Sequence, residues 1–598
     1  MPCIVLLETS GNQAFIFGTN KLRQNVGASE LTYQAGTMWA MDAAAVIQPE
    51  LALRPGESIG ELLCDRARNP PLGSLLPDGR ISRVEAILAG SGKAMFLVDS
   101  PDTGKQIVQY AALRAARDAP GLDLSGAVGD NFDWDSVPVA ETKGEGDNSR
   151  FVGPVPVLYR THQEAHAYLP SPLRRSRRIP IAAPCAFSGL PATGTVKDLD
   201  AREGDEREED IAVSALAWSK QSVRKNAYKR LKQTLRDADA RDNPSRFDNI
   251  EFPEELDKIP GNWLAIVHAD GNGLGQIFLA FHKYVDRNGT PAEFNRRYVE
   301  TLRCFSVAVD QCTVGAFAAA LAAVWDPAPR GNNGVELSPV VPLILGGDDL
   351  TVVCSGERAL RFTQTYLKEY EERSTSHRVI LDIAKQAFGI GRLSACAGIA
   401  IIKPHFPFST AYSLAEDLIK SAKKVKQEIR GLKTGPAGRD RPYPCSALDF
   451  YVVYDASAVE LRAIRERLTV GDARLYGGPY IVTPIEQLED ATGAHWRRRR
   501  HWDDLVGRID AITESDEDDR PALPSSQFHD LRAGLFLGRS AADARYALIR
   551  ARYSPKLLKR LEGDNHSLFW KDEKSYTTGF LDAMEAAAFM TQRGETHG

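Results

Sequence analysis

Cysteine is scarce in this sequence, and the spacing of the few cysteines excludes several classes of protein. Eight cysteines are scattered over 598 residues, and no two of them form a CxxC pair. Several lie in apolar segments, which is typical of small buried side chains. The pattern argues against a disulfide framework and against a complete cysteine-type zinc site. We therefore expect a reducing compartment, and hence a cytoplasmic protein.

The sequence also has little net charge and lacks segments typical of targeting or membrane insertion. The formal net charge of -5 gives no overall attraction to nucleic acid, so any such contact must come from local basic patches. The N-terminal segment 1–8 has no basic region, and its apolar run is too short for a signal peptide. We expect no stretch long and apolar enough to span a membrane, and therefore no membrane partner.

The remaining composition is typical of globular proteins, with 43% hydrophobic and 26% charged residues. At 598 residues the chain is too long for a single core. A prior of one domain per roughly 150 residues predicts about four domains. The order of apolar and charged segments places them at 1–160, 161–255, 256–455 and 456–598.

Two strand ends in the third segment carry aspartates beside glycines. The apolar run 263–267 leads to Asp270 and a glycine-rich loop, Gly271 to Gly275, and the apolar run 342–345 turns through Gly346-Gly347 into Asp348-Asp349. Carboxylates from neighbouring strand ends can bridge two divalent cations roughly 3.5–4 Å apart. Glycines permit turns with positive φ and let backbone amides approach phosphate oxygens.

An ordinary structural interpretation of these strand ends stays open. Aspartate at a strand end commonly forms a turn, and GGDD can be a simple hairpin tip. Because two such strand ends occur together, we favour a catalytic centre with Asp270, Asp348 and Asp349 as its carboxylates. The residues expected to contact nucleotide phosphates in these strand ends are Gly271, Asn272, Gly273, Gly275, Gly346 and Gly347.

Segments 1–160 and 256–455 share one order of elements, strand–helix–strand–turn–strand–helix–strand. Glu8 stands in the place of Asp270, and Gly90-Ser91-Gly92-Lys93 in the place of GGDD. The fourth strands match when Gly126 is aligned with Gly398. We predict an internal duplication of a ferredoxin-like βαββαβ unit, in which the first copy has lost the paired carboxylates.

Segment 161–255 is predicted to be a linker with several charged stretches. It contains a basic loop at 171–178, a charged stretch at 201–210, and a helix at 216–236 with one basic face. Such a face is commonly only solvated, and binding of RNA or a protein partner is the alternative.

Segment 456–598 is predicted to be largely helical and to dock a partner. Its acidic stretch 514–519 is expected to be a linker. Four arginines at 497–500 lie between Trp496 and Trp502, which fits either phosphate contact with stacking or an exposed helix end.

Four motifs together resemble the large subunit of type III CRISPR effector complexes, the Cas-ten or Cmr large subunit family. They are HADGNGLG at 268–275, GGDD at 346–349, SACAGIA at 394–400 and PHFPF at 404–408. The resemblance implies an α/β (α+β) protein with two ferredoxin-like, GGDEF-cyclase-like palm domains, a helical linker and a C-terminal helical domain. The run 414–423 is similar to the cyclase helix whose lysine binds phosphate, which implies that role for Lys423.

The chain departs from this family at several positions. We expect it to begin in the first palm strand, without the HD nuclease domain that the family often carries, and its zinc module to be reduced to Cys185 with Gly189-Leu190-Pro191. Asn272 stands where many cyclase relatives have an acidic residue. The implied cation ligands are therefore Asp270, the backbone carbonyl of Gly271, Asp348 and Asp349.

The resemblance implies a nucleotidyltransferase that joins ATP into cyclic oligoadenylate, with two Mg²⁺ or Mn²⁺ ions and with guide or target RNA and small CRISPR-type subunits as partners. The residues alone indicate metal-dependent phosphoryl transfer. Two alternatives stay open: a non-catalytic scaffold that binds RNA and partner subunits, and a cyclic dinucleotide synthase. The adjacent like charges of Asp348 and Asp349 argue against a scaffold, because they repel without a cation.

Overall fold

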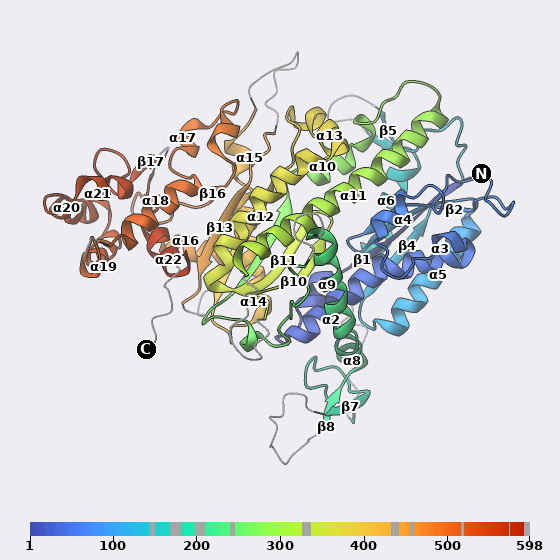
Figure 1. The fold of residues 1–598 in the computed structure, drawn as a ribbon, viewed down its shortest axis with the longest axis horizontal. Helices are drawn as coiled ribbons and strands as arrows, with labels where there is room; N and C mark the ends of the chain where they lie inside the picture. The colour runs from blue at the N-terminus through green and yellow to red at the C-terminus, as the bar shows by residue number, and fades with distance from the viewer. Residues whose placement is uncertain are drawn as a thin grey trace. The chain divides into compact units, whose positions relative to one another are not determined.

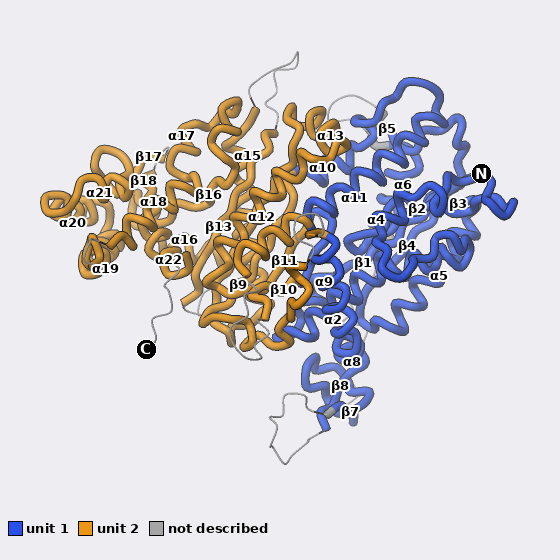
Figure 2. Tube along the Cα trace, in the orientation of Figure 1, with its two compact units in different colours: residues 1–237, 273–314, 343–348 blue, residues 238–272, 315–342, 349–598 orange. Residues whose placement is uncertain are grey.

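The computed structural model describes residues 1–143, 150–167, 181–197, 210–239, 245–325, 337–431, 442–454, 460–515, 520–572 and 575–590 (Figure 1). The predicted basic loop at 171–178, the charged stretch at 201–209 and residues 516–519 of the acidic linker lie outside this range. The chain divides into two compact units (Figure 2). Unit 1 comprises residues 1–237, 273–314 and 343–348, and unit 2 comprises residues 238–272, 315–342 and 349–598.

Unit 1 contains a four-stranded antiparallel sheet in the order β2-β3-β1-β4. Its strands are β1 (Cys3–Ser10), β2 (Val84–Gly90), β3 (Lys93–Val98) and β4 (Asp123–Val128). Between β1 and β2 lie α1 (Asn12–Phe17), α2 (Leu22–Gly36), α3 (Met38–Ile47), η1 (Pro49–Leu51) and α4 (Ile59–Cys64), and α5 (Pro101–Asp118) joins β3 to β4. This is the predicted βαββαβ order.

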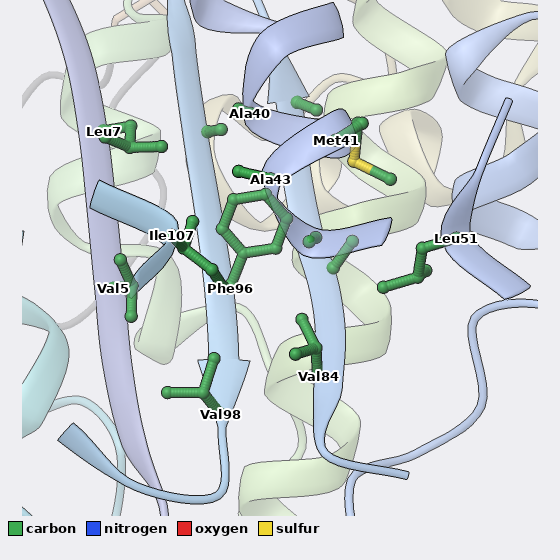
Figure 3. Close-up of a cluster of buried hydrophobic side chains, with 14 of the residues drawn as sticks. Val5, Leu7, Ala40, Met41, Ala43, Leu51, Val84, Phe96, Val98 and Ile107 are labelled. Atoms are coloured by element: carbon green, nitrogen blue, oxygen red, sulfur yellow. The ribbon is translucent and has the colours of Figure 1, made fainter. Parts of the chain in front are cut away.

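One face of this sheet forms an apolar core with α3 and α5. Phe96 of β3 lies among Val5, Ile107 and Ala43, all of them buried (Figure 3). Because β1 is apolar on both faces, it occupies a central position in the sheet with a neighbour on each side.

Unit 1 also contains two small hairpins and several helices. The hairpins are β5 (Glu141–Lys143) with β6 (Arg150–Val152), and β7 (Gly194–Lys197) with β8 (Asp210–Val213). The helices are α6 (Pro154–Ala167), α8 (Ala215–Ser222), α9 (Arg224–Asp239), α10 (Leu274–Leu279), η4 (Phe281–Lys283) and the first part of α11 (Pro291–Val324). The helix predicted at 216–236 is therefore two helices, which meet at Val223.

Among the described helices, α11 alone is long and apolar enough to cross a membrane by length and composition. The expectation that no stretch reaches this length is therefore wrong. In the structure 61% of its most apolar window is buried inside the protein, and the core helices of soluble proteins pass the same test.

The second sheet has six strands in the order β10-β11-β9-β12-β13-β16. They are β9 (Leu264–Gly271), β10 (Val340–Gly346), β11 (Asp349–Ser355), β12 (Ala395–Ile402), β13 (Ala447–Val452) and β16 (Tyr480–Ile481). Its helices are α12 (Gly356–Ser376), α13 (Arg378–Phe388), α14 (Phe408–Ala422) and α15 (Val425–Glu428), and η3 (Leu256–Lys258) precedes β9.

The sheet orders confirm the predicted duplication. β1, β2, β3 and β4 correspond to β9, β10, β11 and β12, and both sets lie in the same order. Glu8 pairs with Lys93 as Asp270 pairs with Asp349. The alignment of the fourth strands is wrong by one residue, because Glu8 pairs with Ser125 whereas Asp270 pairs with Cys396. The predicted alignment matched Gly126 with Gly398, but the sheet register does not place these two glycines at equivalent positions.

The C-terminal part of unit 2 is not purely helical. Its helices are α16 (Leu461–Arg467), η5 (Ile485–Leu488), α17 (Ala494–Arg497), α18 (Trp502–Thr513), α19 (Ser525–Leu535), α20 (Arg539–Arg550), α21 (Pro555–Leu561) and α22 (Phe580–Met590). They pack with a small sheet in the order β14-β15-β18-β17. The strands are β14 (Thr469–Val470), β15 (Ala473–Arg474), β17 (Trp570–Asp572) and β18 (Ser575–Thr577). These strands of two or three residues are too short to show a period in the sequence.

We expect Gly398→Ala to destabilise the second sheet, because α14 packs directly on β12 at this residue. A Cβ there would collide with the carbonyl oxygen of Ala415 and lie 2.5 Å from the backbone nitrogen of Ile419. Overpacking of this kind costs about 1–3 kcal/mol. Gly507→Ala is the matched control, since Gly507 lies within α18 and a Cβ on it would meet nothing within 4 Å. It should stabilise by about 0.5–1 kcal/mol. Urea unfolding of both variants measures the difference, and equal stabilities would contradict the packing described.

Candidate metal centre

Three carboxylates meet where β9 ends and β11 begins. Asp270 on β9 pairs directly with Asp349, the first residue of β11, and Asp348 precedes Asp349 in the turn from β10. One oxygen from each of the three carboxylates lies within 4.8 Å of the others. In the described part of the chain, no other group of three histidine, cysteine or acidic side chains has this geometry. The structure therefore brings together the three carboxylates predicted from the sequence.

Burial and like charge make this arrangement costly when no cation neutralises it. Burial raises the pKa of Asp349 to about 6. A neighbouring carboxylate favours the neutral acid in the same direction, whereas a bound cation favours the ionised form. Hard divalent cations prefer carboxylate oxygens, so the donor set fits Mg²⁺ or Mn²⁺.

Lys423, which follows the last residue of α14, reaches this centre. Its ammonium forms an ion pair with Asp270. Burial lowers the pKa of Lys423 to about 8, and the charge of Lys426 contributes in the same direction. The lysine predicted to bind phosphate is thus at the centre, where its contact is to a carboxylate.

His268, two residues before Asp270, is half-buried. Its Nδ1 lies 2.9 Å from the hydroxyl oxygen of Thr351, and its ring centroid is 5.6 Å from that of Tyr412. Burial lowers the pKa of His268 to about 4, and the charge of Lys423 adds to this effect. The imidazole is therefore neutral at physiological pH.

The predicted phosphate-binding loop contains residues with different roles. Gly271 is the last residue of β9 and pairs with Ala395. Gly273 has a φ of +78° and precedes α10, and a Cβ on Gly275 would meet nothing within 4 Å. Gly275 therefore has open space beside its backbone, and its contact with phosphate stays a prediction.

Asn272 has a different environment from its neighbours in the loop. Its buried amide donates to the hydroxyl of Ser394, the sulfur of Cys396 and the carbonyl oxygen of Cys445, at 3.1, 3.3 and 3.1 Å. None of these partners belongs to the carboxylate triad. The side chain thus connects β9 to the neighbouring strand regions, and the geometry gives no support to the predicted contact with phosphate.

Gly346 and Gly347 are held by groups that the sequence analysis missed. Gly347 has a φ of +58°, which favours glycine, and a Cβ there would collide with the hydroxyl of Ser91. Its N–H donates to Oδ1 of Asp310 at 2.8 Å, and its carbonyl oxygen accepts from the hydroxyl of Thr313 at 2.5 Å. Asp310 is the only charged residue between 304 and 324 of an otherwise apolar helix, a signal that was available in the sequence.

The first palm has an ion pair where the second has facing carboxylates. Lys93 occupies the position equivalent to Asp349, and its ammonium lies 3.1 Å from Glu8. Nδ1 of His162 lies 3.5 Å from the other carboxylate oxygen of Glu8. The ammonium of Lys93 thus stands where the second palm has a carboxylate. This agrees with the predicted loss of the paired acids from the first palm.

Three of the four arginines at 497–500, for which phosphate contact or an exposed helix end was expected, bind other parts of unit 2. Arg497 donates to the carbonyl oxygen of Leu488, and Arg499 donates to those of Glu562 and Gly563. Arg500 is 5% exposed and forms an ion pair with Asp572. The alternative of an exposed helix end is therefore wrong for the buried Arg500, whereas Arg497 and Arg499 are half-buried and Arg498 is exposed.

Two of the basic residues predicted on the face at 216–236 are also engaged within unit 1. Lys220 is 3% exposed and donates to the carbonyl oxygen of Phe15. Arg230 forms a 2.7 Å ion pair with Glu30 and lies over the ring of Tyr33. Lys225 and Lys229 on α9 are exposed, so a smaller basic surface than predicted is available to a partner.

Comparison with known proteins supports the predicted resemblance. Residues 263–430 match the family model described as Cas10/Cmr2, second palm domain. The resemblance to the Cas-ten large subunit family is thereby confirmed on the segment that carries the carboxylates. A search of curated proteins found no match.

Solved structures match a larger part of the chain than the family model does, at low sequence identity. A chain of the structure described as "Crystal structure of Csm1-Csm4 cassette in complex with AMPPNP" is 11% identical, with a TM-score of 0.41, and the match covers 98% of this chain and 69% of that chain. A chain of the corresponding complex with cA4 is 14% identical, with a TM-score of 0.35, over 73% of this chain. The present chain spans 54% of the length of that relative.

Asp348→Ala combined with Asp349→Ala should abolish tight Mn²⁺ binding without unfolding the protein. In the presence of a chelator we expect the melting temperature to be unchanged or raised, because a like-charge repulsion is removed. The folded state raises the pKa of Asp349, so its ionised form destabilises the fold increasingly as the pH rises through about 6. The gain in melting temperature should therefore be larger at pH 8 than at pH 5. Unaltered Mn²⁺ binding, measured calorimetrically, would contradict the assigned ligands.

Proposed function

We propose that this chain, whose residues 263–430 belong to the Cas10/Cmr2 second palm family, is a metal-dependent nucleotidyltransferase that makes cyclic oligoadenylate from ATP. The observation that carries this proposal is the convergence of Asp270, Asp348 and Asp349 within 4.8 Å at two neighbouring strand ends. Three clustered carboxylates beside an accessible glycine loop are suited to a nucleoside triphosphate with divalent cations.

We propose two Mg²⁺ or Mn²⁺ ions, held by the three carboxylates and the backbone carbonyl of Gly271. When bound, such ions supply Lewis-acid stabilisation of phosphate oxygens and lower the pKa of a nearby hydroxyl. The absence of a cysteine or histidine from the ligand group favours these hard cations over zinc.

Lys423 is suited to exchange one anionic partner for another. Its ammonium compensates Asp270 in the structure, and a cation at that carboxylate would take over the neutralisation. The released ammonium could then contact the triphosphate, for which a compact point charge is well suited. We also propose that the triphosphate contacts the backbone at Gly275, where a Cβ would meet nothing within 4 Å.

The reaction we propose is attack of the 3′-hydroxyl of one ATP on the α-phosphorus of another. A 3′–5′ phosphodiester bond forms, the bond to the leaving pyrophosphate breaks, and the hydroxyl proton passes to solvent. Repetition and a final intramolecular step close the ring. Guide or target RNA and small CRISPR-type subunits are the proposed partners, and Lys225 and Lys229 on α9 are exposed for such contact.

Two other functions make different predictions. A non-catalytic scaffold would bind RNA and partner subunits without forming any phosphodiester product. A cyclic dinucleotide synthase would form a product containing two nucleotides, most directly from GTP. Neither explains the structure better, since the scaffold has no use for three facing carboxylates and no described contact identifies a guanine pocket.

The test is incubation of the purified chain with each nucleoside triphosphate and Mn²⁺, followed by identification of products by mass. We expect ATP to give cyclic oligoadenylate. Asp270→Asn should lower the rate by at least about a hundredfold, because it removes a ligand rather than a supporting contact, whose loss alone costs 10–100-fold. Glu8→Gln is the matched control in the first palm and should retain most of the activity. Absence of any product would favour the scaffold, and equal losses in both variants would mean that the palms share one site.

A further inference from the structure

The turn before the paired aspartates is held at one residue by two side chains of α11. The N–H of Gly347 donates to Oδ1 of Asp310, and the hydroxyl of Thr313 donates to the carbonyl oxygen of Gly347. Asp310 and Thr313 are three residues apart, so they lie on the same face of the helix. Both backbone polar groups of Gly347 are therefore bound by side chains from a single helix face.

The same turn is also confined by the first palm hairpin within unit 1. The hydroxyl of Ser91 would collide with a Cβ on Gly347, and it would lie 3.4 Å from a Cβ on Gly346. Oδ1 of Asp310 would lie 3.2 Å from the Cβ on Gly346. The turn thus has little freedom to move toward either α11 or Ser91.

A carboxylate on an apolar helix, such as that of Asp310, loses hydration when it is buried, which destabilises the fold unless polar partners replace the water. Burial raises the pKa of Asp310, whereas the N–H of Gly347 and the charge of Arg230 on α9 oppose that rise. A buried carboxylate is stable only where such partners compensate its lost hydration. Its observed partner in hydrogen bonding is the turn that carries the aspartates.

We infer that Asp310 and Thr313 are positioning residues, which fix the Gly347 backbone and thereby the direction of the Asp348 and Asp349 side chains. The catalytic part of this inference rests on the proposed function, and the structural part does not. Side chains that carry cations must be held within about 0.5 Å of the productive geometry by supporting contacts. Two hydrogen bonds at the residue directly before Asp348 restrict the turn in this way.

The experiment compares variants that remove each contact with variants that retain it. Thr313→Val removes the hydroxyl donor to Gly347, and Asp310→Ala removes the acceptor for its N–H. Thr313→Ser keeps the donor, and Asp310→Asn keeps an acceptor oxygen. Ser306→Ala on the same helix is the control, because the buried hydroxyl of Ser306 has no hydrogen-bond partner among the described residues. Mn²⁺ affinity is measured by electron paramagnetic resonance, and hydrogen exchange is followed in the peptide around Gly347.

We expect Thr313→Val and Asp310→Ala to weaken Mn²⁺ binding by about tenfold, the effect of losing one hydrogen bond of this kind. Exchange at Gly347 should accelerate, and turnover of ATP should fall more than its KM changes. Thr313→Ser, Asp310→Asn and the control Ser306→Ala should have Mn²⁺ affinity and exchange rates close to those of the wild type. Wild-type Mn²⁺ affinity and exchange in Thr313→Val would overturn the inference, even if Asp310→Ala failed to fold. If the wild type makes no cyclic product, the proposed function fails, and the exchange data still decide the positioning role.

A second inference concerns two exposed cysteines on neighbouring helices of unit 1. Cys64 ends α4, and Cys304 lies on α11. Contacts on either side place them opposite each other. A Cβ on Gly60, one turn before Cys64, would lie 3.0 Å from Val307, and Arg66 forms a 2.9 Å ion pair with Glu300, one turn before Cys304.

The environment of the two thiols differs. A hydrogen bond from Cys64 lowers the pKa of Cys304 to about 6, and the charges of Arg303 and Arg66 contribute in the same direction. The same pairing raises the pKa of Cys64. A low-pKa, exposed thiol beside a second thiol has the arrangement needed for disulfide exchange.

We propose that Cys64 and Cys304 form a dithiol modification site that a small disulfide such as oxidised glutathione converts to an intramolecular disulfide. The Cys304 thiolate attacks one glutathione sulfur, which forms a mixed disulfide and releases one glutathione. Cys64 loses its proton to solvent and attacks the Cys304 sulfur, which releases the second glutathione. The two thiols lose two electrons, and one oxidised glutathione is reduced to two thiols.

The test treats the full chain with oxidised glutathione and maps the products by peptide mass spectrometry without reduction. We expect a peptide pair linked through Cys64 and Cys304, which dithiothreitol releases, and a higher melting temperature because the link closes a long loop. Cys64→Ser should leave glutathione attached to Cys304. The buried Cys354 serves as the internal control and should stay unmodified. Absence of the linked pair, with either a persistent mixed disulfide or free thiols, would overturn the proposal.

Discussion

The constraint on which this structure depends is the repulsion between three carboxylates at adjoining strand ends. Asp270 and Asp349 are directly paired across two strands, and Asp348 adds a third negative charge to the same small volume. Burial raises the pKa of Asp349, because the ionised form loses hydration there. The arrangement persists because each aspartate is attached to an apolar strand whose register is fixed by its own core packing. Lys423 compensates one of the charges.

The two palms show how little sequence change is needed to remove such a centre. They share a sheet order and the pairing register at the end of the first strand. At the residue opposite the strand-end acid, the second palm has Asp349 and the first has Lys93. A carboxylate there leaves two like charges that require a cation, whereas an ammonium forms an ion pair with Glu8. Lys93 in place of Asp349, together with Gly92 in place of Asp348, therefore distinguishes a palm with an ion pair from a palm whose carboxylates could hold a cation.

The sequence predicted those features that depend on local pattern. Apolar strand runs, the paired βαββαβ order and the convergence of Asp270, Asp348 and Asp349 all follow from periodicity and from strand ends meeting at one sheet edge. The structure differs where tertiary contacts decide. Arg500 resembles a surface charge in a run of four arginines, yet Asp572 and two tryptophans enclose it. The short hairpins β14–β15 and β17–β18 form one sheet only because β15 pairs with β18, which lies far from it in the sequence.

The role of the GGDD glycines shows the same limit in the interpretation of a motif. From sequence, both glycines were expected to let phosphate oxygens approach the backbone. In the structure the space beside Gly347 is taken by Ser91, its N–H by Asp310 and its carbonyl oxygen by Thr313. These glycines are therefore required by the close approach of protein groups and by a positive φ. The accessible backbone lies instead at Gly275, in the first turn of α10. The first palm, though it has lost its own acids, thus contributes through Ser91 to the shape of the turn that carries the acids of the second.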